Sequence, residues 1–417
     1  MEKLNEILKY KLKKNISCMP NLIVTTLKAL IKGKLGIGKL NGLERFILAQ
    51  LSLPDRVPTL LSATNIEPYM LDPKYNWKLT VESIEANVEL ADIVCERFDC
   101  DMVAMPIWQG LMPFGACEMG TEFKISEERV PYSVGYPIKT KEDIKKIKLP
   151  EEATGHLKMY FDLNLEIQKR HPELFLPLTL DGPWDLAMLL RGDAKLPMDM
   201  RLHKDYVETD DPIRKEKIRK RGDPDIYPAI MELTTQAVIS IFDLAAKYGL
   251  SLMGSTMIDQ YTAPPIMGRE DFVKYVLPYI ERVWRHHKKK IMIVAPCISP
   301  MQMRKILETE PKGINHQILW SNYTFPTTPE GITLPEYDRF AFELAKEYKK
   351  SFSYIVHGKF LRDSTEQEIE ALVKRVCTLA KEIRVSISIA ISAVPPGTDL
   401  EKINYLFKKV QEYGRYK

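Results

Sequence analysis

Cysteine is scarce in this chain, with six residues among 417. Secreted domains that depend on disulfides are short and use cysteine far more densely. The low count excludes a disulfide framework and favours free thiols in a reducing compartment, so we expect a cytoplasmic protein. The six are Cys18, Cys95, Cys100, Cys117, Cys297 and Cys377.

An excess of charge of one sign is also missing, because 60 Lys and Arg residues oppose 56 Asp and Glu residues. A net charge of +4 excludes the strongly basic class of dedicated nucleic-acid binders. The hydrophobic run nearest to a membrane span, Met19–Ile31, is short and is interrupted by Pro20, Asn21 and Lys28. The basic start lacks a small-residue cleavage site. We therefore expect no nucleic-acid partner, no transmembrane segment and no signal peptide.

The start of the chain differs in composition from the rest. Residues 1–40 contain nine lysines and two glutamates. Apolar residues recur there at helical spacing with lysines between them: Leu4, Ile7, Leu8 and Leu12. We interpret residues 1–42 as a basic helical extension and residues 43–417 as the main domain. Packing of the extension on that domain or on a homodimer mate is favoured over contact with a membrane surface or an acidic partner.

From residue 43 onward, short apolar runs alternate with long amphipathic stretches such as Arg269–Arg285 and Thr365–Ile383. The eight runs are Val57–Ser62, Asp101–Met105, Leu174–Leu180, Leu250–Ile258, Lys290–Ala295, His316–Trp320, Phe352–His357 and Ser386–Ser392. They are mostly apolar on both faces, as strands covered by helices must be. This pattern predicts an α/β fold, a (β/α)8 TIM barrel. An open doubly wound sheet is the alternative, but no glycine-rich turn follows the first run.

Catalytic side chains of such barrels lie where the strands end. Asp181 and Asp259 are candidates for a proton-transfer pair or for binding a cation, and His357 for orienting a substrate oxygen. The predicted substrate-binding residues are Asn65, Trp108, Trp184, Tyr261, Cys297, Asn322, Lys359 and Ser392. Structural roles are the alternative for each type: helix capping for the aspartates, a hydrogen-bonded imidazole, and core packing for the tryptophans. If the barrel is correct, five of these residues converge at one mouth, with Trp184 or Trp108 on its wall: Asp181, Asp259, Cys297, His357 and Ser392.

Two segments interrupt the alternation of runs. Residues 201–228 are highly charged, and Tyr323–Pro335 is rich in Thr and Pro. We interpret both as long surface loops near the barrel mouth, with a solvated helix face as the alternative for the charged one. The adjacent His286 and His287 end a basic helix, where they complement the helix dipole.

Several motifs, in order along residues 43–417, carry a family resemblance. They are Leu43–Phe46 with Pro54–Pro58, Pro137–Asp143, Gly182–Trp184 with Gly192, Phe272 with Tyr275 and Pro278-Tyr279, and Val394–Thr398. With these motifs the chain resembles the uroporphyrinogen decarboxylase superfamily, which also contains corrinoid-dependent methyltransferases. The resemblance implies a TIM-barrel enzyme.

The residues at the decarboxylase site positions differ from those of true uroporphyrinogen decarboxylases. Those enzymes carry arginines after strand one, a tyrosine six residues after the turn proline and a histidine at the end of strand eight. This chain has no arginine in Ser62–Glu67, and Leu189 and Ser392 occupy the other two positions. A tetrapyrrole with many carboxylates needs a basic cavity, so uroporphyrinogen is not the expected substrate.

The zinc positions of the thiol-methylating branch differ as well. That branch uses a His-x-Cys after strand five and a cysteine at the end of strand eight. Here the corresponding residues are Ala295, Cys297 and Ser392. Alanine has no donor atom and serine replaces thiolate poorly, so we expect no zinc there and no tightly bound cofactor.

The resemblance implies methyl transfer between a corrinoid protein and a small methylated or methoxylated compound. The corrinoid, as methyl carrier on a partner protein, and the small molecule are the expected partners. Two alternatives remain open: a uroporphyrinogen decarboxylase-like lyase acting on a smaller acid, and a non-catalytic binding protein that has lost the zinc site.

Overall fold

The computed structural model describes most of the chain beyond residue 54. The described ranges are 55–62, 66–104, 114–171, 178–250, 256–259, 267–287, 317–321, 334–391 and 394–416, with the single residues Ala29, Glu44, Arg45, Leu48, Thr262, Arg304 and Glu308. Ala29 is therefore the only described residue of the predicted extension, and it is helical and buried.

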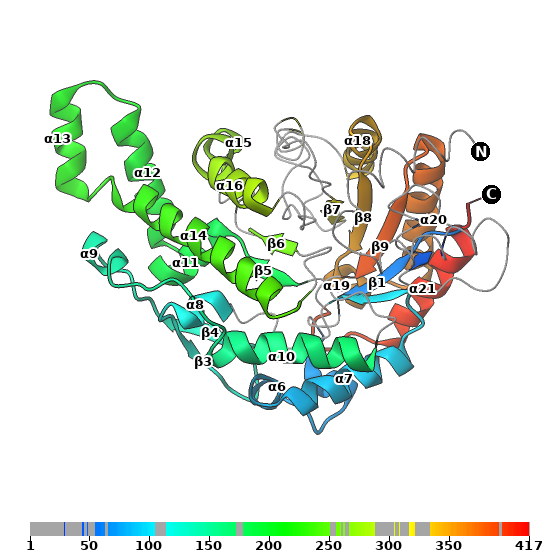
Figure 1. The fold of residues 1–417 in the computed structure, drawn as a ribbon. Coiled ribbons are helices and arrows are strands. Elements are labelled where there is room, and N and C mark those ends of the chain that lie inside the picture. The colour runs from blue at the N-terminus through cyan, green and yellow to red at the C-terminus, as the bar shows by residue number, and fades with distance from the viewer. Residues whose placement is uncertain are drawn as a thin grey trace.

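Parallel strands form the centre of the described fold, with helices around them (Figure 1). These strands are β1 (Thr59–Ser62), β2 (Met102–Ala104), β5 (Thr179–Asp181), β6 (Thr256–Ile258), β7 (Gln317–Ser321), β8 (Ser351–Val356) and β9 (Ile387–Ile391). They pair in the order β2-β1-β9-β8-β7 and, separately, β5-β6. Seven of the eight predicted runs thus overlap a strand, while Lys290–Ala295 lies outside the described residues.

The last strand of the chain lies next to the first, as closure of a parallel barrel requires. Leu60 of β1 pairs with Ala390 of β9 and, on its other side, with Met102 of β2. After the intervening βα units, the last strand therefore pairs with the first. In an open sheet whose strands are added in chain order, these two strands would lie at opposite edges.

An antiparallel hairpin lies outside this parallel arrangement, and the sequence analysis missed it. Its strands are β3 (Glu122–Lys124) and β4 (Tyr132–Gly135), paired antiparallel. Both strands are short and largely exposed or half-exposed, so they lack the apolar run by which the other strands were found.

Helices connect and cover the strands. Those before β6 are α5 (Pro68–Leu71), α6 (Trp77–Glu82), α7 (Ile84–Arg97), α8 (Phe114–Glu118), α9 (Lys141–Ile144), α10 (Gly155–Arg170), α11 (Pro183–Arg191), α12 (Lys195–Val207), α13 (Pro212–Arg221) and α14 (Ile226–Lys247). Those after β6 are α15 (Arg269–Asp271), the π-helical turn η5 (Phe272–Val276), α16 (Leu277–His287), α18 (Leu334–Glu347), α19 (Gly358–Asp363), α20 (Glu366–Ile383) and α21 (Glu401–Tyr413).

Both helices predicted by amphipathic spacing are present. The helix predicted over Arg269–Arg285 contains the π-turn, just before Pro278, which has no N–H to donate to the preceding turn. The second begins one residue after Thr365, whose side chain forms a capping box with Glu368.

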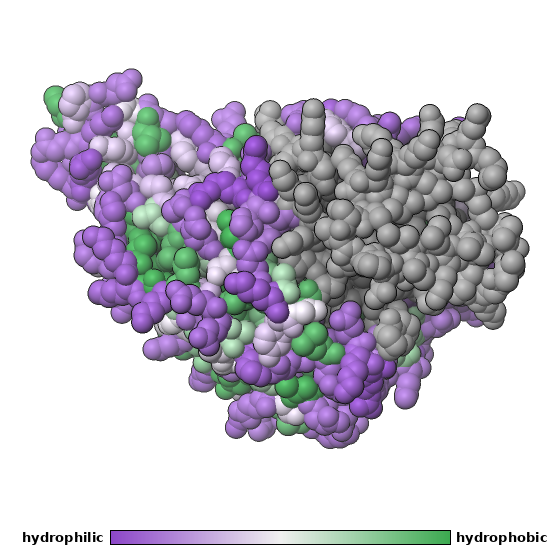
Figure 2. Space-filling model, in the orientation of Figure 1, coloured by the Kyte–Doolittle hydropathy of each residue, from purple (hydrophilic) through white to green (hydrophobic). Residues whose placement is uncertain are grey.

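The charged segment over residues 201–228 is helical, so its interpretation as a loop was wrong. It consists of the second half of α12, all of α13 and the start of α14. The α12–α13 pair projects from the body in Figure 1, and Figure 2 shows mostly hydrophilic side chains over it. Asp211 accepts a hydrogen bond from the amide of Ile213, and Pro212 stands at the first helical position. The charge run is thus the solvated face of a capped helix.

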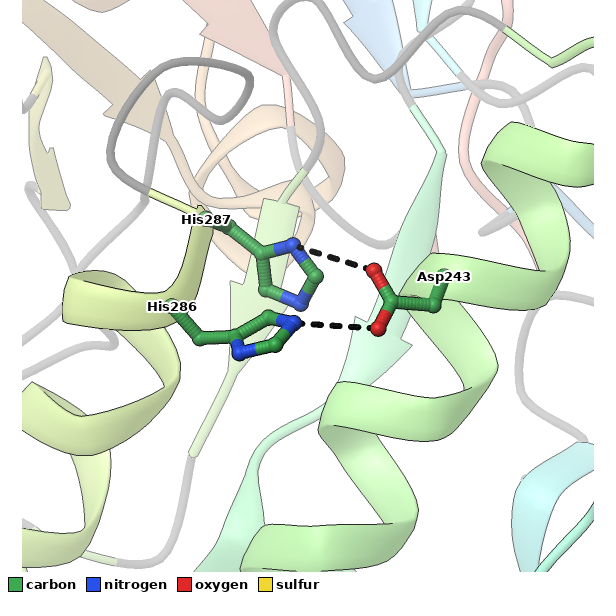
Figure 3. Close-up of side chains that lie close together, drawn as sticks. All are labelled: Asp243, His286 and His287. Atoms are coloured by element: carbon green, nitrogen blue, oxygen red, sulfur yellow. Dashed lines mark hydrogen bonds and ion pairs between the residues drawn. The ribbon is translucent and has the colours of Figure 1, made fainter.

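Helix α14 is long and apolar enough to cross a membrane by length and composition, but half of that stretch is buried within the protein. It packs against α11 and α16 as an interior helix. Near its end, Asp243 faces His286 and His287 at the end of α16 (Figure 3).

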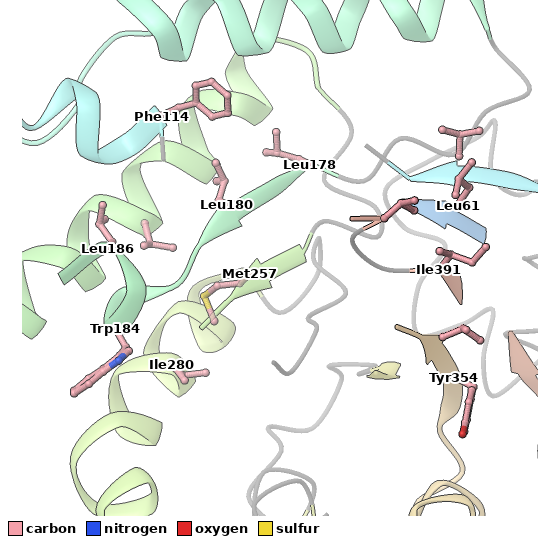
Figure 4. Close-up of a cluster of buried hydrophobic side chains, with 14 of the residues drawn as sticks. Leu61, Phe114, Leu178, Leu180, Trp184, Leu186, Met257, Ile280, Tyr354 and Ile391 are labelled. Atoms are coloured by element: carbon pink, nitrogen blue, oxygen red, sulfur yellow. The ribbon is translucent and has the colours of Figure 1, made fainter. Parts of the chain in front are cut away.

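Buried apolar side chains join the strands to these helices. Figure 4 shows side chains from β5, β6, α11 and α16 on one side of the core and Leu61, Tyr354 and Ile391 on the other. Directly before β2, the carboxylate of Asp101 accepts a hydrogen bond from the guanidinium of Arg56 at 2.6 Å and also pairs with Arg45. The side chain of Asp101 is only 4% exposed, so this ion-pair cluster fixes the segment before β1 to the sheet.

Candidate active site

Asp181 and Asp259 lie together at the ends of two paired strands. Asp181 is the last residue of β5 and pairs in parallel register with Ile258, which Asp259 follows directly. Asp259 is 1% exposed and Asp181 is partly exposed. The two carboxyl groups thus come to one edge of the β5–β6 pair, as the rule for strand ends predicts.

The carboxylate of Asp259 also caps a helix across the sheet. Its Oδ1 accepts hydrogen bonds from the backbone amides of Trp184 and Asp185, both at 3.0 Å, in the first turn of α11. Gly182, which precedes this helix, has no side chain to do so. The hydroxyl of Thr262 donates to the Asp259 carbonyl at 2.8 Å and fixes its backbone. Asp259 therefore supplies the cap from 75 residues away.

Glycine is required at position 182 because the carboxylate of Asp259 lies directly against the backbone there. A Cβ built at this position would lie 2.1 Å from Oδ2 and 2.3 Å from Cγ of Asp259. No larger residue fits unless the carboxylate moves, so Gly182 is what lets Asp259 lie against the backbone between β5 and α11.

One oxygen of Asp259 is left without a hydrogen bond. Among the described residues, Oδ2 is buried and has no partner, whereas Oδ1 accepts both amides. A buried carboxylate oxygen without a donor is costly in its charged form, and protonation at that oxygen removes the charge.

The environment raises the pKa of both aspartates. Desolvation raises the pKa of Asp181 to about 7. Desolvation also raises the pKa of Asp259, and the charge of Asp181 adds to this, while the two amides of α11 oppose it. Since the two groups interact, they titrate as a pair and not as separate sites. Near neutral pH the pair holds a proton that it can give or accept.

Two residues beside this pair were not found from the sequence. Cys117 on α8 and Tyr160 on α10 both lie close enough to Asp181 for its charge to contribute to their raised pKa values. The hydroxyl of Tyr160 donates to the Thr179 carbonyl at 2.9 Å, and its ring stacks on Phe114 with centroids 4.3 Å apart. Desolvation, the largest cause, raises the pKa of Cys117 to about 12, so its thiol stays protonated at neutral pH.

Trp184, predicted to bind substrate, is fully buried at the start of α11. Its ring packs against Tyr227 with centroids 6.3 Å apart, and Tyr227 donates a hydrogen bond to the Tyr275 carbonyl at 2.5 Å. In this structure the indole belongs to the core that supports the aspartate pair.

His357 follows β8 and caps α19. Its Nδ1 accepts a hydrogen bond from the Lys359 amide at 3.1 Å. Desolvation and then the charge of Lys359 lower the pKa of His357, which favours neutral imidazole. The ammonium of Lys359 is exposed and pairs with Asp363 at 2.6 Å. The capping geometry matches the structural alternative for His357, and its convergence with the aspartates stays a prediction.

The other predicted substrate-binding residues lie outside the described part of the chain. They are Asn65, Trp108, Tyr261, Cys297, Asn322 and Ser392. Each remains a prediction from the position of its strand end.

Comparison with known proteins identifies a family match and a fold match. The family model described as uroporphyrinogen decarboxylase matches residues 49–413. A solved structure, a methyltransferase from Methanosarcina mazei, has a TM-score of 0.67 at 15% identity and covers 90% of this chain and 99% of its own. A second, Fpglu1 from Fervidobacterium pennivoraus, has a TM-score of only 0.35 at 11% identity, covering 86% of this chain and 96% of its own. No curated protein sequence matches.

Proposed function

Because the chain belongs to the uroporphyrinogen decarboxylase family, we propose that it is an enzyme that moves a methyl group between a corrinoid protein and a small methylated or methoxylated compound. The similarity in fold to a methyltransferase over 90% of the chain supports this class. The family match and the pairing of β9 with β1 support a closed eight-stranded barrel around the site. The observation that carries the proposal is the Asp181–Asp259 pair.

The chemistry needs a proton at the oxygen or nitrogen from which the methyl group leaves. The bond from the methyl carbon to this atom breaks, and its electron pair stays on the atom. The pair for the new bond to carbon comes from the reduced corrinoid of the partner protein. As this bond breaks, a carboxyl group with a raised pKa gives its proton to the leaving oxygen or nitrogen, and in the reverse direction the carboxylate takes it back.

Zinc has no part in this mechanism. The residues at the zinc positions of the thiol-methylating branch are Ala295, Cys297 and Ser392. One thiol, one hydroxyl and no donor at the first position do not make a zinc site. We expect substrates whose leaving atom is activated by protonation, such as ethers and amines, in preference to thiols that need activation by zinc.

Decarboxylation of a small acid is the second candidate, favoured by the family match itself. Loss of CO2 leaves an electron pair on carbon, and the Asp181–Asp259 pair can donate the proton that replaces the carboxyl group. The absence of arginine from Ser62–Glu67 favours an acid with few carboxylates over a tetrapyrrole.

Methyl transfer to reduced cobalamin from a panel of methoxylated and methylated compounds tests the proposal. We expect at least one compound to react, and Asp181→Asn to lower the rate about 100-fold or more. Asp193→Asn changes an exposed carboxyl after α11 and should leave the rate unchanged. Release of CO2 from a small acid without methyl transfer would favour the second candidate. Ligand binding with neither reaction would indicate a binding protein.

A further inference from the structure

We propose that Asp243, His286 and His287 form a binding site for a divalent transition-metal ion such as Zn²⁺. Asp243 lies near the end of α14, and the two histidines are the last residues of α16. One ligand atom from each residue lies within 4.8 Å of the others, and this is the only such group of three found among the described residues (Figure 3).

The carboxylate of Asp243 already faces both imidazoles, with one oxygen directed at each ring (Figure 3). Nε2 of His286 is 3.0 Å from Oδ2 of Asp243, and Nδ1 of His287 is 3.9 Å from Oδ1. The imidazole rings lie edge to face, with centroids 4.6 Å apart. Metal–ligand bonds of about 2.0–2.2 Å need donor atoms about as close as these, so small side-chain rotations suffice.

The site is partly built into the core. His287 is 1% exposed, and its ring packs edge-on against Phe242 with centroids 5.3 Å apart, which limits its rotation. His286 and Asp243 are more exposed, with side chains 46% and 37% accessible, so an ion can enter. None of the ion pairs that the structure describes joins Asp243 to a lysine or arginine.

Two imidazoles and one carboxylate are ligands suited to Zn²⁺, with water completing the shell. The C-terminal end of α16 also favours a positive charge. Helices of βα units run back across the sheet, so the ends of α14 and α16 lie at the edge where strands begin. The proposed metal site is thus separate from the Asp181–Asp259 pair at the strand ends. A bound ion is expected to link the end of α16 to α14, because it takes ligands from both helices.

Titration of the metal-free full-length protein with Zn²⁺ by calorimetry tests this. We expect one ion per chain, with affinity at least tenfold lower in His286→Ala and in Asp243→Asn. Neither substitution removes a buried apolar group, and circular dichroism checks that both variants fold. His156→Ala, a partly exposed histidine on α10, is the matched control and should bind as the wild type does.

Failure of the wild type to bind Zn²⁺ would overturn the proposal. Equal affinity in the wild type, His286→Ala and Asp243→Asn would overturn it as well, because the ion would then be held elsewhere. A rise in melting temperature on adding Zn²⁺ that is absent from both variants would support it, since a ligand that binds only the folded state stabilises that state.

Discussion

Replacement of Asp181 by asparagine should change how stability depends on pH. The pKa of Asp181 rises from an ordinary value of 3.8 to about 7 because its carboxyl is desolvated. Between these values the folded state binds more protons than the unfolded state, so the free energy of unfolding falls as pH rises through this window. Each tenfold change in proton affinity is about 1.4 kcal/mol, so the loss reaches up to about 4 kcal/mol by pH 8.

The variant lacks this loss, because the asparagine amide does not titrate. We expect Asp181→Asn and the wild type to be similarly stable near pH 4.5. At pH 8 the variant should be more stable by up to about 4 kcal/mol. Removing the charge of Asp181 also lowers the pKa of Asp259, which flattens the profile further.

Urea denaturation from pH 4.5 to 8.5 measures this difference. Asp193→Asn is the control, since that carboxyl is exposed and its variant should keep the slope of the wild type. Parallel profiles for the wild type and Asp181→Asn would refute the reasoning, because Asp181 would then ionise as freely in the folded protein as in the unfolded chain.

Gly182→Ala should destabilise the protein by about 1–3 kcal/mol in urea and lower any activity, because its Cβ displaces the Asp259 carboxylate; unchanged stability would contradict the close approach. A chain starting at Asn41 keeps Arg45 and its contact with Asp101, so it should stay soluble and melt cooperatively; aggregation or loss of the near-UV circular dichroism signal would place the extension in the core or in a dimer interface. Cys297→Ser should leave Zn²⁺ binding unchanged in calorimetry, because Ala295 and Ser392 cannot complete a site with that thiol; lost binding would contradict this.

The strands were predictable because each is a short apolar run, whereas exposed elements were not. β3 and β4 bury little, so their sequences carry no such signal. The α12–α13 segment was predictable in principle, since Asp211-Pro212 is a typical helix start, but its run of charges is equally typical of a surface loop.

The site was predictable only as far as the rule for strand ends reaches. That rule selected Asp181 and Asp259, since each lies at or directly after the end of its strand. It does not show that Asp259 caps α11, because this contact joins residues 75 apart. The position of Tyr160 beside Asp181 depends on how α10 packs, and the meeting of Asp243 with His286 depends on two helices that lie side by side. Contacts of this kind come from tertiary packing and leave no local pattern.

The proposed proton transfer requires the Asp181–Asp259 pair to hold a proton at neutral pH, which infrared spectroscopy measures directly. Infrared difference spectra of the wild type against Asp181→Asn and Asp259→Asn, recorded from pH 5 to 9, report protonated carboxyl groups. We predict a protonated-carboxyl band at pH 7 in the wild type that is reduced or absent in both variants and that weakens in the wild type as the pH rises to 9. No band at pH 7, or a band of equal strength in the variants, would show that the pair is ionised and contradict the proposed proton transfer.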